Sequence, residues 1–211
     1  MKPLFCLTFL LVTNCLIAQT TSEIIIPPYK DTYSELIKRM ESGDTNIDYR
    51  KFRESFIESK QFIVASAEKK TFDSLKKEMY AQMKESNYPE ILAITKAMLS
   101  INYTSLLAHK ILRQTYKIIG DTINAKKYHD IQFGLLHSIV DNGNGKTCET
   151  SWPVIEISEE YFILEMINAK LLTQTLEGHC DKMEVQVDDN KKTYYFEISK
   201  VFEGYKKLGL N

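Results

Sequence analysis

The segment from Asp141 to Glu160 gathers most of the side chains that could carry chemistry. Oxygen ligands occur over Asp141–Glu149, and four glutamates follow the glycine-rich run, at positions 149, 156, 159 and 160. Paired carboxylates can serve as general acid and base, and a run of Asp, Asn and Glu can hold a hard cation such as calcium. The candidate binding residues are Asp141, Asn144, Lys146, Thr147, Glu149, Trp152, Glu159 and Glu160.

Each catalytic motif in this segment is incomplete. Gly145-Lys146-Thr147 resembles the end of a phosphate-binding loop, but that motif needs a glycine five residues before Gly145, where Val140 stands. The oxygen-rich run lacks the spacing of an EF-hand. We therefore expect no cofactor, no metal and no catalytic residue. The alternative is a hydrolase or metal-assisted enzyme that uses the carboxylates around 141–160, with a histidine as a further candidate.

The histidines and serines form no known catalytic or metal-binding pattern. The sequence contains no His-x-x-x-His pair and no Cys-x-x-Cys pair, which are common zinc-ligand spacings. Ser151 and Ser158 lack the Gly-x-Ser-x-Gly context of a hydrolase nucleophile. His129 and His137, eight residues apart, point in different directions if they lie on one helix.

Residues 1–18 have the pattern of a secretory signal peptide. Lys2 precedes an apolar stretch from Leu4 to Ala18, which is shorter than the roughly 20 residues that span a membrane. Cleavage after Ala18 predicts an exported protein of the periplasm or cell envelope, with no integral membrane segment. The alternative is a lipoprotein anchored through Cys15, but the bulky Asn14 before it favours simple cleavage.

The signal peptide changes the meaning of the cysteines. Cys148 and Cys180 remain after cleavage, and an oxidising compartment permits a disulfide between them. The alternative is two unpaired cysteines. The charge is balanced, with 27 basic and 28 acidic side chains, so a highly basic nucleic-acid binder and a disordered acidic tail are excluded and no nucleic-acid partner is expected.

The apolar pattern predicts helices in the first half of the chain. Spacings of three and four residues predict helices over 33–40, 48–58 and 71–84. Asn87, with Glu90 three residues on, predicts the start of another helix. The next helix places Ile111, Tyr116 and Ile119 on its apolar face and ends at Gly120.

A spacing of 34 residues separates Asn87 from Asp121, which caps a further helix. This is the period of tetratricopeptide repeats. The run from Ser86 to Asp121, with Ala108 and Tyr116, resembles about one and a half such repeats. Ile91 departs from the repeat pattern, where a small residue is typical.

Beyond residue 141 the pattern becomes glycine-rich and β-branched. We expect a loop over 141–147, a strand over 154–157, a helix capped by Ser158, and strands over 170–176, 183–187 and 193–198. A five-residue loop over 188–192 would join the last two strands. The fold class is α+β: an N-terminal helical-hairpin, tetratricopeptide-like array over 24–140, followed over 141–211 by a Gly-rich loop, a small helix and an antiparallel β-sheet packed on the helical half.

The run Gly143-Asn144-Gly145-Lys146-Thr147, followed by Val154-Ile155 and Glu159-Glu160-Tyr161, resembles a family of exported bacteroidete proteins known only as a domain of unknown function. The resemblance covers most of the mature chain and implies an envelope location, without a known activity, cofactor or catalytic residue. We therefore expect a non-enzymatic interaction or scaffold module with a protein or peptide partner.

Overall fold

The computed structural model describes residues 23–210, and the predicted signal peptide and Cys15 lie outside the described residues. The fold is α+β, with a helical array followed by a mixed sheet and a last helix. The helices are α1 (Thr32–Glu41), α2 (Tyr49–Glu58), α3 (Lys60–Ala67), α4 (Lys69–Lys84), α5 (Tyr88–Ile101), α6 (Leu106–Ile118), α7 (Thr122–Val140), the 3₁₀ helix η1 (Cys148–Thr150), α8 (Ile157–Met166) and α9 (Ser199–Lys207). The strands are β1 (Trp152–Pro153), β2 (Ala169–Glu177), β3 (Cys180–Val187) and β4 (Asn190–Glu197). Over residues 23–210, none of the helices combines the length and the apolar character needed to cross a membrane.

Short polar side chains begin several of the helices. Asp31 accepts a hydrogen bond from the Ser34 backbone N–H at the start of α1, and Asp121 accepts one from Asn124 at the start of α7. Such caps satisfy backbone donors that the first helical turn leaves free. Asn87 precedes α5 as predicted, but its side chain donates to Gln82 and does not cap the helix.

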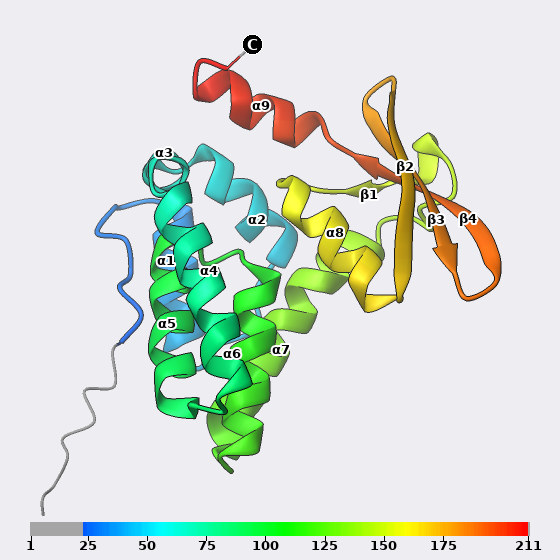
Figure 1. Cartoon of the computed structure of the whole chain (residues 1–211). Coiled ribbons are helices and arrows are strands. Elements are labelled where there is room, and N and C mark those ends of the chain that lie inside the picture. Colours follow the sequence, from blue (N-terminus) through cyan, green and yellow to red (C-terminus); the bar gives the residue numbers. More distant parts are fainter. Residues whose placement is uncertain (1–22, 211) are drawn as a thin grey trace, which may run out of the picture.

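Helices α4 to α7 pack each on the next in sequence and stand side by side, while α8 lies between them and the sheet (Figure 1). The predicted helical array is therefore present. The structure adds α3, whose first turn is capped by Ser59, a helix that the sequence pattern did not predict. Aromatic rings fill the space between α1 and α2, where Tyr33 stacks on Phe52 with ring centroids 5.2 Å apart.

The sheet has the order β1-β4-β3-β2. Its antiparallel part, β2-β3-β4, confirms the three strands expected from the sequence, and β1 adds a short parallel edge, with Trp152 beside Phe196. The turn between β3 and β4 is two residues long instead of five, because Val187 pairs directly with Asn190. Asp188 takes the left-handed backbone conformation (φ 52°) that tight hairpin turns require.

The entry to α8 also differs from the expectation. The strand ends at Pro153, and the helix starts at Ile157 with Glu156 in the capping position, so the strand over 154–157 and the Ser158 cap were wrong. Val154 donates its backbone N–H to Glu197 and is the last residue attached to β4. Beyond that point no sheet partner remains among the described residues, and the chain turns into the helix.

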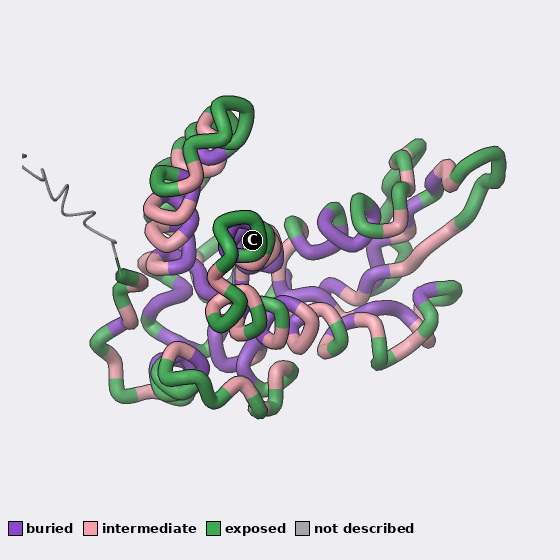
Figure 2. Tube along the Cα trace, turned by 90° about the horizontal axis from the view of Figure 1, so that it is seen from below, coloured by how far each residue is buried: buried purple, intermediate pink, exposed green. Residues whose placement is uncertain are grey.

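One buried core runs through both parts of the chain. It includes Phe52 and Leu112 from the helical array and Met183 and Phe196 from the sheet. Figure 2 shows buried positions along the middle of the molecule and exposed ones at the hairpin turns and outer helical faces. Helix α9, also not predicted, returns from the sheet to the helical array, where Gly204 lies against the ring of Phe62.

Candidate functional site

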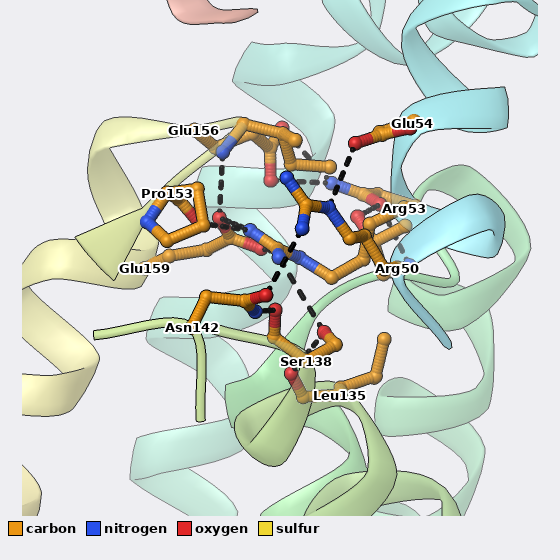
Figure 3. A network of polar contacts seen from close by, with 12 residues as sticks. Arg50, Arg53, Glu54, Leu135, Ser138, Asn142, Pro153, Glu156 and Glu159 are labelled. Atoms are coloured by element: carbon orange, nitrogen blue, oxygen red, sulfur yellow. Dashed lines mark hydrogen bonds and ion pairs between the residues drawn. The ribbon is translucent and has the colours of Figure 1, made fainter. Parts of the chain in front are cut away.

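The junction between the helical array and α8 is built around a buried ion pair. Arg53 of α2 donates to both carboxylate oxygens of Glu159 in α8, at 3.0 and 2.6 Å. Both side chains are 3% exposed. Arg53 also donates to the Pro153 carbonyl, and Glu159 accepts the Ile155 backbone N–H at 2.8 Å. Figure 3 shows the guanidinium held among these groups, so the pair has little capacity left for a ligand.

Two further glutamates of this segment form no ion pair among the described residues: Glu156 is half-buried and Glu160 is buried. Glu156 accepts two hydrogen bonds from Asn102, and burial together with the charge of Glu159 raises its pKa to about 7. Glu160 is fully buried, and neither of its oxygens has a hydrogen-bond partner among the described residues. Burial, reinforced by the charge of Asp181, raises the pKa of Glu160 to about 8. This shift favours the neutral, protonated form of Glu160 near pH 7.

The candidate residues of the loop lie at the surface, in contrast to the buried Glu159 and Glu160. Asp141, Asn144, Lys146, Thr147 and Glu149 are exposed. Asn144 accepts hydrogen bonds from the Lys146 backbone and the Thr150 hydroxyl, so it organises the loop itself. The Asp141 carboxylate lies 3.1 Å from Nδ1 of His137.

Trp152 anchors the loop to the sheet. Its indole N–H donates to the Gly143 carbonyl at 3.1 Å, and its ring stacks on Tyr194. Gly145 has φ 65°, and a Cβ atom there would come within 2.9 Å of the Trp152 ring. Tyr195 of β4 also donates its backbone N–H to Gly145. The loop is therefore a packed part of the fold, and the indole is not free to contact a partner.

The carboxylates named by the enzyme hypothesis do not meet at one cleft. Glu159 and Glu160 are buried inside, whereas Asp141 and Glu149 face solvent. In the part of the chain that the structure describes, the group of His, Cys, Asp or Glu side chains close enough to share a cation is Cys148, His179 and Cys180. Cys148 and Cys180 form a disulfide, which removes both thiolates from metal binding. The geometry gives no support to a hydrolase centred on residues 141–160.

A second polar cluster lies inside the helical array. The Glu41 carboxylate accepts hydrogen bonds from the hydroxyls of Tyr103 and Tyr128 and from the Lys127 ammonium. Beside it, His109 is buried with Nε2 2.7 Å from the Tyr103 carbonyl, and burial lowers its pKa to about 4. Its neutral ring therefore carries the proton on Nε2. All of these donors to the Glu41 carboxylate come from the helical array itself, so this cluster stabilises the array.

An apolar groove of about 470 Å³ opens where α4 and α6 end and α5 begins. Its lining is formed by Met83, Ser86, Tyr88, Ile91, Ile111, Gln114, Thr115, Lys117 and Ile118. Ile119, which follows the lining residue Ile118 in the chain, is 46% exposed. The sequence pattern placed Ile119 on the buried face of its helix, which was wrong, because Ile119 is the C-cap residue that follows α6 and is 46% exposed. The feature of the sequence that could have indicated this surface is the adjacent pair Ile118-Ile119 at the end of a helix.

Another hollow, of about 670 Å³, lies between the segment before α1 and the end of α2. Lys30, Asp31, Glu58 and Lys60 give its lining both signs of charge. This mixed lining specifies no ligand class, whereas the groove beside Ile118 is mainly apolar.

A family model described as a domain of unknown function, DUF4919, matches residues 28–207. The chain belongs to this family. The match covers the helical array, the sheet and α9 together, so DUF4919 comprises both halves of the fold. No curated protein and no solved structure gives a significant match to the chain.

Proposed function

We propose that this DUF4919 protein is an exported, non-enzymatic binding module of the cell envelope, and that the groove between α4, α5 and α6 holds its partner. The observation that carries the proposal is a groove of about 470 Å³ with Ile118 61% exposed at its rim. Apolar grooves of this size accept the side chains of a peptide or helix. The signal-like residues 1–18 support an extracytoplasmic location.

The lining also indicates the chemistry of the partner. Lys117 is the one charged side chain among the described residues that line the groove, and Gln114 and Thr115 supply hydrogen-bonding groups among the apolar residues. We infer a short amphipathic segment of another protein that places two or three apolar side chains in the groove and a carboxylate near Lys117. A tetratricopeptide-like array is a common scaffold for peptide binding of this kind.

Site-specific photocrosslinking tests the proposal. A photoreactive residue at Gln114 should trap one defined partner in envelope preparations, and a matched probe at Ile63, which is 49% exposed on α3, should not trap it. Ile118→Asp should abolish the adduct because it puts an unpaired charge on the apolar surface. Equal adducts at both positions, or an adduct insensitive to Ile118→Asp in a folded protein, would reject the groove.

The exposed loop is the second surface to test. Deleting it would remove Gly145 and its hydrogen bond from Tyr195, so a deletion would confound folding with binding. Lys146→Glu and Glu149→Lys leave the loop backbone intact and reverse its exposed charges. Partner capture that is unchanged by both substitutions and lost in Ile118→Asp would assign binding to the groove.

A further inference from the structure

Strand β2 forms the edge of the sheet. It pairs with β3 on one side, and within residues 23–210 no strand pairs with its other side. Most of its residues are exposed, including Leu172 at 42% and Leu176 at 60%. An edge of this kind presents a row of unpaired backbone N–H and C=O groups, which is a template for another strand.

A bulge fixes which β2 side chains share a face. Leu171 pairs with Val185 and Thr173 with Glu184, so Leu172 has no partner on β3. Because side chains alternate along a strand, the bulge shifts this alternation by one residue. Lys170, Thr173, Thr175 and Glu177 therefore lie on the face that carries Glu184 and Lys182, and Leu171, Gln174 and Leu176 lie on the face that carries Met183 and Asp181.

With these faces assigned, β2 is complementary to itself. An antiparallel copy centred on Gln174 places Lys170 opposite Glu177, Leu171 opposite Leu176 and Thr173 opposite Thr175. Every pair joins residues of the same face, and Leu172 is the bulged residue in both strands. Opposite-charge, aliphatic and Thr–Thr cross-strand pairs are each stabilising. A register without Lys170 opposite Glu177 loses the charge match.

The charges at the two ends are available for this pairing. In the described chain, Lys170 is exposed and has no carboxylate partner. Glu177 is 56% exposed on its side chain and contacts Lys182 through one oxygen, Oε2, at 3.4 Å. Its other oxygen can accept a second cation. Tyr161 of α8, 46% exposed, donates its hydroxyl to Gln174 and adds apolar surface at the centre of the pairing.

We propose that two copies of this protein associate through antiparallel pairing of their β2 strands, across a two-fold axis at Gln174 that sets Lys170 of each copy against Glu177 of the other. The pairing continues the sheet through both molecules. The partner is a second copy because the register is self-complementary in face, charge and bulge position. The groove at α4–α6 is not part of this interface, so the two proposals fail independently.

Charge reversal tests the register in sedimentation experiments over a concentration series with the purified protein. Lys170→Glu and Glu177→Lys should each weaken dimerisation about tenfold, because each replaces two attractive contacts by two repulsive ones. An equimolar mixture of the two variants should form a heterodimer, since one copy then carries glutamate at both positions and the other carries lysine at both. The double variant should dimerise like the wild type. Lys191→Glu, in the exposed start of β4, is the matched control and should dimerise normally.

A cysteine probe locates the axis. Gln174→Cys should give a disulfide-linked dimer on mild oxidation, because cross-strand Cα atoms are about 4.5–5.5 Å apart, and Lys191→Cys should not. Circular dichroism and melting of each variant separate lost pairing from lost folding. A wild-type chain that stays monomeric up to about 100 µM, or single charge variants that dimerise like the wild type and do not form the heterodimer preferentially, would overturn the proposal.

Discussion

Arg53 and Glu159, 106 residues apart in sequence, meet as a two-point ion pair in the core. Arg53→Leu leaves the Glu159 charge buried without a cation, and we expect the free energy of unfolding to fall by about 3–5 kcal/mol. The double variant Arg53→Leu/Glu159→Leu should recover part of this loss. Urea denaturation of the three variants measures the coupling.

Arg50, one turn earlier on α2, is the matched control. Its ion pair with Glu54 is exposed on both sides, at 57% and 41%, and Arg50→Leu should change stability by less than about 1 kcal/mol. Equal effects of the Arg50 and Arg53 substitutions would contradict the distinction drawn from burial.

Glu160 makes the stability depend on pH. Its pKa of about 8 in the folded chain lies above the ordinary value of 4.5, so the folded state binds this proton more tightly than the unfolded state. The contribution is complete below about pH 4.5 and is lost as pH rises towards 8. We expect Glu160→Gln to behave like the wild type at about pH 5 and to be more stable by about 1–3 kcal/mol at about pH 8.5.

The comparison requires denaturation curves at both pH values. Glu165→Gln is the control, because Glu165 is exposed on the same helix and its substitution should shift both curves equally. Glu156, whose pKa is raised to about 7, contributes in the same direction in every variant. A constant difference between Glu160→Gln and the wild type across pH would rule out a buried proton at this position.

Two glycines separate backbone strain from packing. Gly145 and Gly178 have nearly the same positive φ, 65° and 64°, but a Cβ atom at Gly178 meets nothing within 4 Å whereas one at Gly145 meets Trp152. Both substitutions to alanine should cost about 1–2 kcal/mol from the backbone, and Gly145→Ala should cost about 1–3 kcal/mol more from overpacking. Thermal melting and Trp152 fluorescence check this. Identical losses would mean that the loop moves away from the indole without penalty.

The disulfide joins residues 32 apart in sequence, in η1 and β3. Cys148→Ala/Cys180→Ala should lower the free energy of unfolding by about 2–4 kcal/mol. A dithiol reductant should lower the stability of the wild type by a similar amount and leave the double variant unchanged. A wild-type protein that is insensitive to the reductant while free thiols are demonstrated would show that the crosslink contributes little.

The helices with strong apolar periodicity and polar caps, such as α1, α2 and α7, were predictable from the sequence. α9 was not predicted, because its buried residues are Val201 and Gly204, and the glycine has no side chain to signal burial. The β3–β4 turn was overestimated because Lys191 and Lys192 resemble loop residues. In the structure they pair with Gln186 and Val185 at an exposed end of the sheet.

The candidate site, like the fold, was predicted only in part from the sequence. The exposed loop was located correctly, but Glu159 and Glu160 were named as candidate binding residues, and both are buried. Their burial depends on Arg53 and on the sheet, and spacing along one segment gives no information about a partner that far away. The sequence pattern did not predict the groove, because Ile118 and Ile119 fit the spacing of residues on the buried face of a helix. Ile118, the last residue of α6, and Ile119, its C-cap, are nevertheless 61% and 46% exposed.

The return of α9 to the helical array has a mechanical consequence. Lys207 donates its ammonium to the carbonyls of Ile57 and Glu58 at the end of α2, both at 2.8 Å. A pull on the C-terminus is therefore resisted first by α9 against α2 and α3, and the load reaches the hydrogen bonds of β4 only after α9 has peeled away. The docking of α9 therefore protects the hydrogen bonds of β4 from a force applied at the C-terminus.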